Sequence, residues 1–335
     1  MLAIEIYRWP TSDCNGASPR NIRLRGQSII EYVLIIAIIG LVIVFAGPGV
    51  AGAIRNQFNL VGNTLNSGTH GGTEGGDASG GGSAGTDSAT IQAAITKDPK
   101  DWTLDEQEAV AKDIAKNGTS SIAYAKAKAA MDAGTKFSMK LTNGETLTYR
   151  IIGINHDDLA DASGKAGLTF LTTSTNISSH MNATDTNVGG WEKSELRQKM
   201  NGGEIWNLMP ADFQSKVKCV RKLTNNVDGE TKDAAVTATS DRLFLLSYSE
   251  IVGTPKSALS EWPWLGQEGT QYEYFKGKVT ANNRYNDCLN IGNAWWERSV
   301  NPSDHFNLQL VNNDGYVGCA GSATNSLCVC PAWCF

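Results

Sequence analysis

The sequence predicts an α+β chain in three parts: a hydrophobic N-terminal helix that spans a membrane, a Gly-rich linker, and a large C-terminal region of mixed helices and strands. Three observations support this prediction. Residues 29–46 are apolar except for one Glu. Residues 67–90 contain nine Gly and no aromatic residue. The rest of the 335-residue chain shows helical and strand patterns separated by turn residues.

The composition indicates a folded body and limits the kinds of partner. Hydrophobic residues make up 41% of the chain and charged residues 19%, which excludes wholesale disorder. The formal net charge is -5 and no dense run of Lys and Arg is present. Because binding to a phosphate backbone relies on such runs, we expect no nucleic-acid partner.

The cysteines gather near the C-terminus. Six follow residue 26, at Cys219, Cys288, Cys319, Cys328, Cys330 and Cys334. An even number in an exported chain favours disulfides, with free buried thiols as the alternative. The spacing lacks the paired C-x-x-C knuckles of zinc sites, so we expect no metal and no cofactor.

The apolar run is long enough for a membrane helix. A helix from Gln27 to Ala46 would be about 30 Å long, the thickness of a hydrocarbon core. Arg20, Arg23 and Arg25 precede it and are expected to stay in the cytoplasm, which places the later residues outside. We therefore expect insertion in the cytoplasmic membrane before the protein reaches the cell surface.

The residues around the start of this run have a recognisable spacing. Gly26 and Gln27 are followed at a fixed distance by Glu31 and Tyr32. The segment 20–55 resembles the N-terminus of Flp-type prepilins of tight-adherence pili, a type IV-like family. The resemblance implies that a prepilin peptidase removes the leader 1–26, that 27–66 is a pilin-like helix, and that Glu31 pairs with the new amine of a neighbouring pilin subunit. The alternative is a plain signal anchor in which Glu31 occurs by chance.

The chain is much longer than a usual Flp-type pilin, which is little more than the helix. Residues 67–90 read as a flexible Gly/Ser tether to a head. In the segment 91–134, Thr103 and Glu106 form a capping box, and the helix they begin is expected to end at Asn117–Gly118. A second helix is expected over 120–133. The length indicates a minor or tip pilin rather than the bulk filament subunit.

Residues 135–335 are expected to form one mixed domain. A hairpin is predicted over 136–154 around Asn143–Gly144, and another around Asn313–Gly315. A helix is predicted over 192–200 and a buried strand over 243–253. Trp295 and Trp296 are expected to pack as scaffold in two apolar layers, because neighbours on a strand point to opposite faces.

Several segments of this domain occur in a characteristic order. They are Tyr149–Ile154, Gly189–Arg197, Asp241–Ser247, Trp295–Ser299, Val311–Val317 and Pro331–Phe335. Together they resemble a bacterial surface domain of the C-type-lectin-like class, akin in fold to the formylglycine-generating enzymes. The expected fold class is therefore α+β, with an N-terminal pilin-like transmembrane helix, a Gly-rich linker and a C-terminal C-type-lectin-like domain. The Arg that usually precedes the terminal Pro-Ala is absent here, and a disulfide is a candidate replacement.

No enzymatic signature is present. The copper-binding cysteine pair of the formylglycine-generating enzymes cannot be placed on these cysteines, and His156, His180 and His305 lie in no recognisable motif. Calcium-lectin signatures of the E-P-N or W-N-D kind are also missing. We therefore predict that the protein is not an enzyme.

Polar loops between the scaffold segments are the candidate recognition surface. The predicted ligand-binding residues are Glu297, Asn301, Ser303, Asp304, His305, Asn307, Tyr316 and Ser322. The arrangement resembles the variable region of proteins diversified by retroelements. The predicted function is a pilus-associated minor pilin or adhesin whose head binds an unknown surface ligand, a protein or a glycan. One alternative is a minor pilin whose head serves filament assembly or capping, and another is a surface-anchored oxidase.

Overall fold

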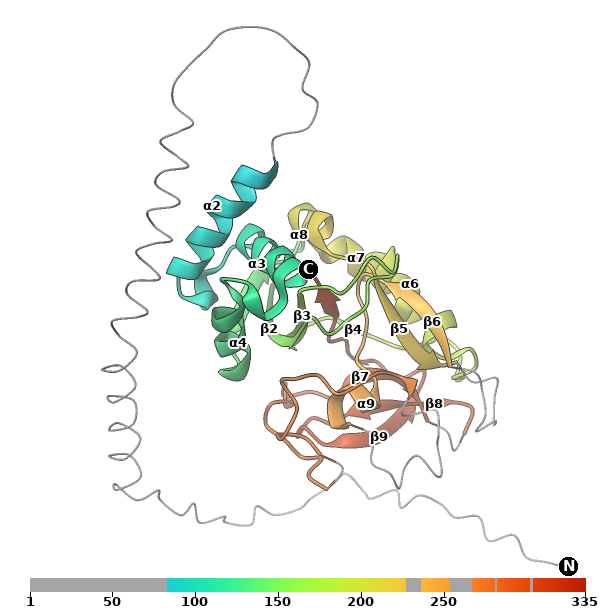
Figure 1. The fold of residues 1–335 in the computed structure, drawn as a ribbon. Coiled ribbons are helices and arrows are strands. Elements are labelled where there is room, and N and C mark those ends of the chain that lie inside the picture. The colour runs from blue at the N-terminus through green and yellow to red at the C-terminus, as the bar shows by residue number, and fades with distance from the viewer. Residues whose placement is uncertain (1–82, 227–235, 254–266, 281, 302–303) are drawn as a thin grey trace, which may run out of the picture. The chain divides into compact units, whose positions relative to one another are not determined.

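The structure is a computed structural model, and it describes residues 83–226, 236–253, 267–280, 282–301 and 304–335 (Figure 1). These residues belong to one compact unit, Gly80–Phe335. In the described ranges the helices are α2 (Ser83–Thr96), α3 (Leu104–Asn117), α4 (Tyr124–Asp132), α5 (Gly190–Lys193), α6 (Glu195–Asn201), α7 (Glu204–Leu208), α8 (Ala211–Lys216) and α9 (Tyr248–Val252). The strands are β1 (Lys136–Lys140), β2 (Thr146–Ile154), β3 (Leu168–Ser174), β4 (Ser178–Ser179), β5 (Val220–Asn225), β6 (Val236–Asp241), β7 (Trp295–Val300), β8 (Asn307–Val311), β9 (Val317–Ser322), β10 (Leu327–Cys328) and β11 (Ala332–Cys334).

The described strands form three sheets. The first has the order β1-β2-β3-β11, the second β4-β10-β7-β8-β9, and the third is the hairpin β5-β6. All pairs are antiparallel except β10 with β7. The last strand of the chain lies beside β3, so the C-terminus returns to the sheet that contains the first strands (Figure 1). The fold is mixed α/β with a β-rich C-terminal region.

The predicted fold class and localisation need correction. None of the helices in the described part of the chain is long and apolar enough to cross a membrane. The longest, α2 and α3, have 14 residues each, which is about 21 Å and short of the 30 Å hydrocarbon core. The predicted insertion in the cytoplasmic membrane is therefore not supported. The segment 27–66, on which that prediction depended, lies outside the described residues.

The helices before the first sheet are mostly as expected. α3 begins at the predicted capping box, in which Thr103 and Glu106 each accept a hydrogen bond from the other's backbone N–H. It ends before Gly118, whose φ of 57° closes the helix. α4 begins at Tyr124, four residues later than predicted, after a 3-10 turn at Gly118–Ser120. The predicted linker ended at residue 90, but its last eight residues belong to α2.

The first predicted hairpin is confirmed, and it builds the main aromatic core. β1 pairs with β2 around Gly144, which has a φ of 86°. The inward residues Phe137 and Tyr149 stack at 5.6 Å between ring centroids. Tyr149 also meets Trp333 of β11 at 4.8 Å. The C-terminal strand is thus held to the first sheet by side-chain packing as well as by backbone hydrogen bonds.

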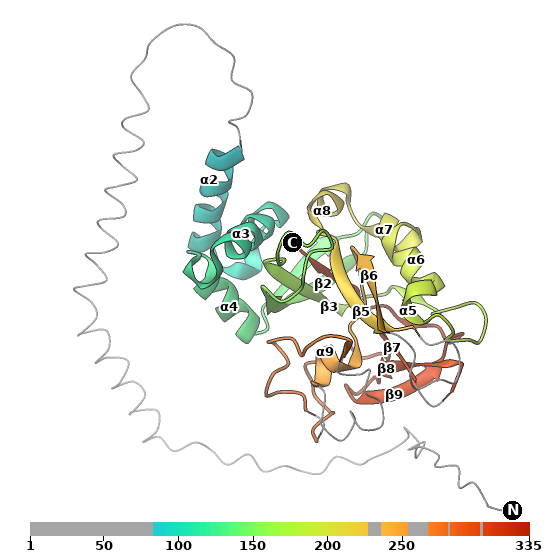
Figure 2. The ribbon, with the colours of Figure 1, turned by 45° about the vertical axis from the view of Figure 1, so that its right-hand side comes forward.

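Two predicted elements of the middle region are wrong in detail. The expected helix over 192–200 is two short helices, α5 and α6, because Ser194 adopts an extended conformation and caps α6. The expected strand over 243–253 is a short extended segment followed by α9. A second capping box, in which Ser247 and Glu250 are the partners, begins α9 and interrupts the apolar run. Figure 1 and Figure 2 show α6 and α7 beside the β5-β6 hairpin.

The second sheet holds the predicted C-terminal hairpin. β8 pairs with β9 across the turn at Asn313–Gly315, where Gly315 has a φ of 83°. Trp295 and Trp296 of β7 are both buried, as expected. Their indole N–H groups donate to different segments, that of Trp295 to the Leu289 carbonyl and that of Trp296 to the Ser179 carbonyl.

Candidate functional site

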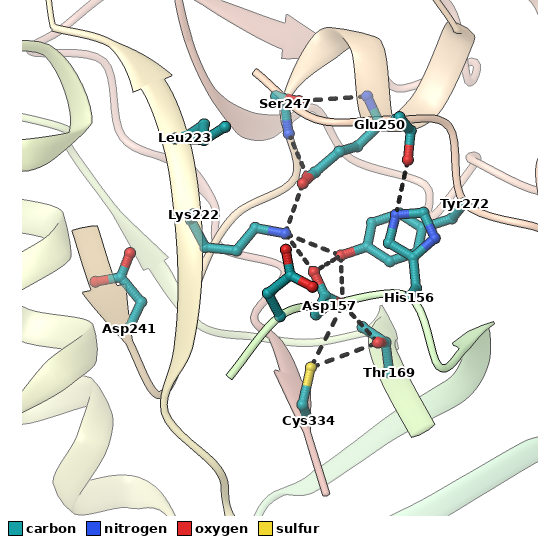
Figure 3. Close-up of polar contacts among 12 residues, drawn as sticks. His156, Asp157, Thr169, Lys222, Leu223, Asp241, Ser247, Glu250, Tyr272 and Cys334 are labelled. Atoms are coloured by element: carbon teal, nitrogen blue, oxygen red, sulfur yellow. Dashed lines mark hydrogen bonds and ion pairs between the residues drawn. The ribbon is translucent and has the colours of Figure 1, made fainter. Parts of the chain in front are cut away.

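A buried network of charged and polar side chains connects β5 to the first sheet and to α9 (Figure 3). Lys222 of β5 places its ammonium nitrogen 2.7 Å from Asp157 and 2.5 Å from Glu250 of α9. Tyr272 donates to Asp157 at 2.9 Å, and Thr169 of β3 donates at 2.6 Å. Burial opposes ionisation of Asp157, but the charge of Lys222 outweighs it and holds the pKa of Asp157 below its ordinary value.

Arg298 of β7 extends this network to the second sheet. Its guanidinium makes two bonds to Glu250, at 2.5 and 2.9 Å. It also donates to the carbonyl oxygens of Leu245, Leu223 and Glu268. Burial disfavours the ionised form of Glu250, yet the neighbouring Arg298 lowers the pKa of Glu250. The arginine therefore satisfies carbonyl oxygens of three separate segments as well as the Glu250 carboxylate.

The buried thiol of Cys334 belongs to the same network. Its sulfur lies 3.4 Å from Thr169 Oγ1 and 3.5 Å from Asp157. Burial, and then the charge of Asp157, raise the pKa of Cys334 well above its usual value. The structure shows no disulfide among the described residues, and Cys219, Cys288, Cys328, Cys330 and Cys334 are free thiols. The disulfide prediction is therefore wrong for these five cysteines, and a neutral thiol buried beside a carboxylate is a poor nucleophile.

His156 has the most enzyme-like surroundings of the described histidines. Its Nδ1 lies 3.2 Å from Glu273, and its Nε2 lies 3.5 Å from the hydroxyl of Thr270. The ring stacks on Tyr272 at 4.0 Å. A distance of 3.5 Å is at the outer limit of hydrogen bonding, so the hydroxyl is weakly held. No group of three or more His, Cys, Asp or Glu side chains in the described ranges is arranged to hold a metal ion.

A cluster of three aromatic side chains and one arginine lies beside the second sheet, with one ring exposed and the other three side chains half-buried. We call Tyr248, Arg284, Tyr285 and Tyr316 the Tyr–Arg face. The rings of Tyr285 and Tyr316 are 4.5 Å apart, and Tyr285 is 58% exposed. The Arg284 guanidinium lies over the Tyr316 ring at 5.0 Å. Burial raises the pKa of Tyr248, and the charge of Arg284 acts in the opposite direction.

The backbone fixes the position of this face. The Val317 N–H donates to the Arg284 carbonyl at 3.1 Å, and Tyr285 forms a bridge with Tyr316. The segment around Arg284 is therefore attached to the start of β9. Gly318 lies beneath, because a Cβ there would be 2.7 Å from Arg284 Nη1 and 3.9 Å from Tyr248 Cε2. The φ of Gly318 is 110°, so both the space and the backbone at this position favour glycine.

The predicted ligand-binding residues do not form one surface. Tyr316 belongs to the Tyr–Arg face at the turn of the β8-β9 hairpin. Asn307 and Ser322 pair at the opposite end of the hairpin, roughly 14 Å away along the strand. Asn301, Asp304 and His305 precede β8 at that same far end, and Ser303 lies outside the described residues.

The polar groups at the far end of the hairpin serve the loop itself. The Asp304 carboxylate accepts bonds from the side chains of Asn301 and Asn307 and from the backbone N–H groups of residues 306 and 307. The amide of Asn187 donates to the carbonyl oxygens of Asp304 and Asn307. Ser322 donates to Asp185 at 2.5 Å. Of this set His305 is exposed, with its ring edge-on to Phe306.

Glu297 was predicted as an exposed loop residue, and this prediction is wrong. Its relative exposure is 0%, because it lies in the middle of β7. Neither carboxylate oxygen has a hydrogen-bond partner among the described residues. Burial, and then the neighbouring Glu268, raise the pKa of Glu297 well above its ordinary value.

The sequence-based prediction missed Tyr248, Arg284 and Tyr285. Arg284 and Tyr285 directly follow the Asn282–Asn283 pair, in a segment with no regular period. Tyr248 is the first residue of a helix that was predicted as a strand. The S-x-x-E spacing from Ser247 to Glu250 is a signal that could have placed that helix correctly.

The comparisons with known proteins add a family but no described activity. Residues 166–335 match a family model described as "Domain of unknown function (DUF6273)". The match contains the whole Tyr–Arg face and starts after Asp157. No curated protein and no solved structure matches the chain.

Proposed function

The chain belongs to the DUF6273 family, whose match covers just over half of it, and we propose that the domain is a binding module that recognises an acidic sugar at the Tyr–Arg face. The observation that carries the proposal is the position of Arg284. Its guanidinium lies over the Tyr316 ring. Among the described residues, the arginines that form ion pairs with carboxylates are Arg197 and Arg298. The cation is therefore available to an external anion.

The chemistry of the face fits a ligand with both an anionic group and a flat apolar side. Arginine binds carboxylates through two parallel hydrogen bonds. Tyr rings provide large contact area at a low cost in side-chain entropy, which is why they dominate natural recognition surfaces. Tyr285 projects beside the arginine with more than half of its surface exposed. A sugar ring could pack on Tyr285 while its carboxylate reaches Arg284.

Glucuronic acid and glucose are matched probes for the proposal, because they have the same sugar ring and only glucuronic acid carries a carboxylate. We expect glucuronic acid to bind the full chain at least about tenfold more tightly than glucose in calorimetric titration, since a charged hydrogen bond contributes about 1.5 to 3 kcal/mol. Arg284→Gln should remove this preference, and Tyr285→Ala should weaken binding of both sugars.

A matched control variant distinguishes an effect of the Tyr–Arg face from an effect of the net charge of the protein. Arg221 is an exposed arginine on β5, and Arg221→Gln should leave the preference intact. Equal binding of the two sugars, or an unchanged preference in Arg284→Gln, would contradict the proposal. Copper-dependent turnover by the purified chain would instead favour the oxidase alternative.

The pilus association is a separate proposal, because Gly26, Gln27, Glu31 and Tyr32 lie outside the described residues. We propose on the prepilin resemblance that a prepilin peptidase cleaves after Gly26 and that the binding module is displayed on a filament. Mass spectrometry of the mature protein should find Gln27 at its N-terminus. An intact Met1, or normal cleavage of a Gly26→Ala variant, would reject this proposal. The alternative of a head that serves only filament assembly predicts no ligand for the Tyr–Arg face.

A further inference from the structure

Arg150 is a buried arginine in the second strand of the first sheet. It belongs to β2, is 9% exposed, and donates from Nη1 to the hydroxyl of Tyr274. In the ranges that the structure describes, the arginines paired with carboxylates are Arg197 and Arg298, so Arg150 has no such partner there. Arginine keeps its proton in proteins, and burial therefore cannot remove this charge. A buried charge normally has a counter-ion, and these residues do not supply one to Arg150.

A second cation lies on the same tyrosine ring. Lys278 Nζ is 3.5 Å from the centroid of the Tyr274 ring, and the Arg150 guanidinium carbon is 5.0 Å from that centroid. Lys276 of the same segment pairs with Glu273, whereas Lys278 has no ion pair in the described part of the chain. An aromatic ring attracts both cations through its quadrupole but carries no net charge. The two like charges therefore share one ring without a carboxylate from these residues to balance them.

The turn after α4 places a glycine at the guanidinium end of this ring. A Cβ at Gly134 would be 3.0 Å from the Tyr274 hydroxyl oxygen and 3.7 Å from Arg150 Nη1. The φ of Gly134 is 64°, which also favours glycine. The C-terminus of α4 carries only about half an elementary negative charge, and Asp132 at this end is paired with Lys128. The helix therefore does not balance two full cations.

A doubly charged oxyanion matches this pair of cations. Guanidinium offers N–H groups in a fixed fork and ammonium is a point charge on a flexible stem, and both groups are common phosphate ligands in proteins. A phosphate ester carries about -1.5 to -2 charges at pH 7 and has three acceptor oxygens, so it can bind both groups at once. A carboxylate has a single charge and would leave one cation unbalanced. Burial lowers the pKa of Lys278, and the charge of Arg150 acts in the same direction, so a bound anion would oppose both effects.

We propose that Arg150 and Lys278 bind a phosphate group beside the Tyr274 ring. The segment 272–279, which contains Lys278, is attached to β2 where the Tyr274 N–H donates to the Ile152 carbonyl at 3.1 Å. A phosphate bound by both cations joins this segment to the first sheet a second time, and it therefore stabilises the fold. The site uses none of the residues of the Tyr–Arg face, so it does not depend on the sugar proposed there.

Calorimetric titration of the full chain with sodium phosphate tests the site. In a chloride buffer at about pH 7, where phosphate is ionised, we expect saturable binding of one phosphate per chain. The midpoint of thermal unfolding should rise with the phosphate concentration, because the ion binds the folded chain. Glucose 6-phosphate identifies the source of the group. Tighter binding of this ester than of free phosphate indicates a sugar phosphate, and equal affinity indicates free phosphate.

Variants of the two cations locate the binding. Lys278→Gln and Arg150→Gln should each weaken phosphate binding by at least about tenfold, since each removes one charged hydrogen bond. Lys278→Arg keeps the positive charge and should retain most of the affinity. Lys276→Gln is the control, because Lys276 is an exposed lysine of the same segment whose partner is Glu273. It should bind phosphate like the unmodified chain.

Three outcomes would overturn the proposal. They are the absence of saturable phosphate binding, an affinity unchanged by Lys278→Gln, and an equal loss of affinity in Lys276→Gln and Lys278→Gln, which would indicate general attraction to positive charge. If Arg150→Gln does not fold because its side chain is buried, Lys278→Gln still decides the result, since Lys278 is half-buried and its ammonium group forms no ion pair in the described ranges.

Discussion

Lys222 Nζ lies 2.7 Å from Asp157 Oδ1 in the interior, where each side chain is 3% exposed. The two residues are 65 positions apart in the sequence. Lys222 belongs to β5, and Asp157 follows β2 and also receives the Thr169 hydroxyl of β3. This ion pair therefore connects the third sheet to the first, and no local sequence pattern specifies it.

Removal of the Asp157 charge should destabilise the domain strongly. Asp157→Asn leaves Lys222 buried with only part of its compensation, and breaking one side of a buried pair costs roughly 3 to 5 kcal/mol. The free energy of unfolding in urea measures the effect. Asp158→Asn is the matched control, because the neighbouring Asp158 is exposed and pairs with Lys165. It should change stability by less than about 1 kcal/mol, and an equal loss in both variants would contradict this account.

The same pair should make the fold sensitive to acid. The pKa of Asp157 is lowered in the folded state, since Lys222 outweighs the opposing effect of burial. The stabilising contribution of ionised Asp157 is therefore fully present above its unfolded pKa of about 3.9, and it is lost as the pH falls further toward the folded value. Unfolding free energies between pH 6 and pH 2.5 should decline less steeply in Asp157→Asn. Parallel curves for the two proteins would show that other groups control acid unfolding.

Local patterns in the sequence were sufficient where short-range chemistry decides the structure. The capping box at Thr103 and the turns at Gly144 and Gly315 were predicted correctly, because each depends on neighbours in the chain. The apolar run from Leu243 was assigned to a strand because hydrophobicity alone does not separate a buried strand from a short buried helix. The capping residues Ser247 and Glu250 decide that case in favour of a helix.

The candidate sites depend on contacts between distant segments, so the sequence could not locate them. Glu297 looks like a polar residue near a loop, yet its strand is covered on both faces and all six residues of β7 are buried. Arg284 and Tyr316 are in different loops, and they meet because Arg284 pairs with Val317 through the backbone. The Asn- and Ser-rich loop was predicted to bind a ligand. In the structure, the Asp304 carboxylate accepts hydrogen bonds from the polar groups of this loop and so orders it.

The buried tryptophans should behave as scaffold. Trp296→Ala removes a fully buried indole and its hydrogen bond to Ser179, which should cost about 3 to 5 kcal/mol. Tyr285→Ala is a matched aromatic control, since Tyr285 is largely exposed. It should change the unfolding free energy by no more than about 0.5 kcal/mol. A stability loss in Tyr285→Ala as large as that in Trp296→Ala would mean that the Tyr–Arg face is a structural element.

The two ends of the β8-β9 hairpin should separate stability from recognition. Asp304→Ala removes an acceptor of four hydrogen bonds in the loop before β8, and it should lower the unfolding free energy by about 1 to 3 kcal/mol while glucuronic acid still binds. Tyr316→Ala removes the ring beneath Arg284, and it should weaken glucuronic acid binding by about tenfold with a smaller loss of stability. Calorimetric titration gives the glucuronic acid affinity of each variant, and urea unfolding gives the free energy of unfolding of each. Should Asp304→Ala abolish binding while Tyr316→Ala leaves it unchanged, the recognition surface would be the loop at the far end of the hairpin, as the sequence first suggested.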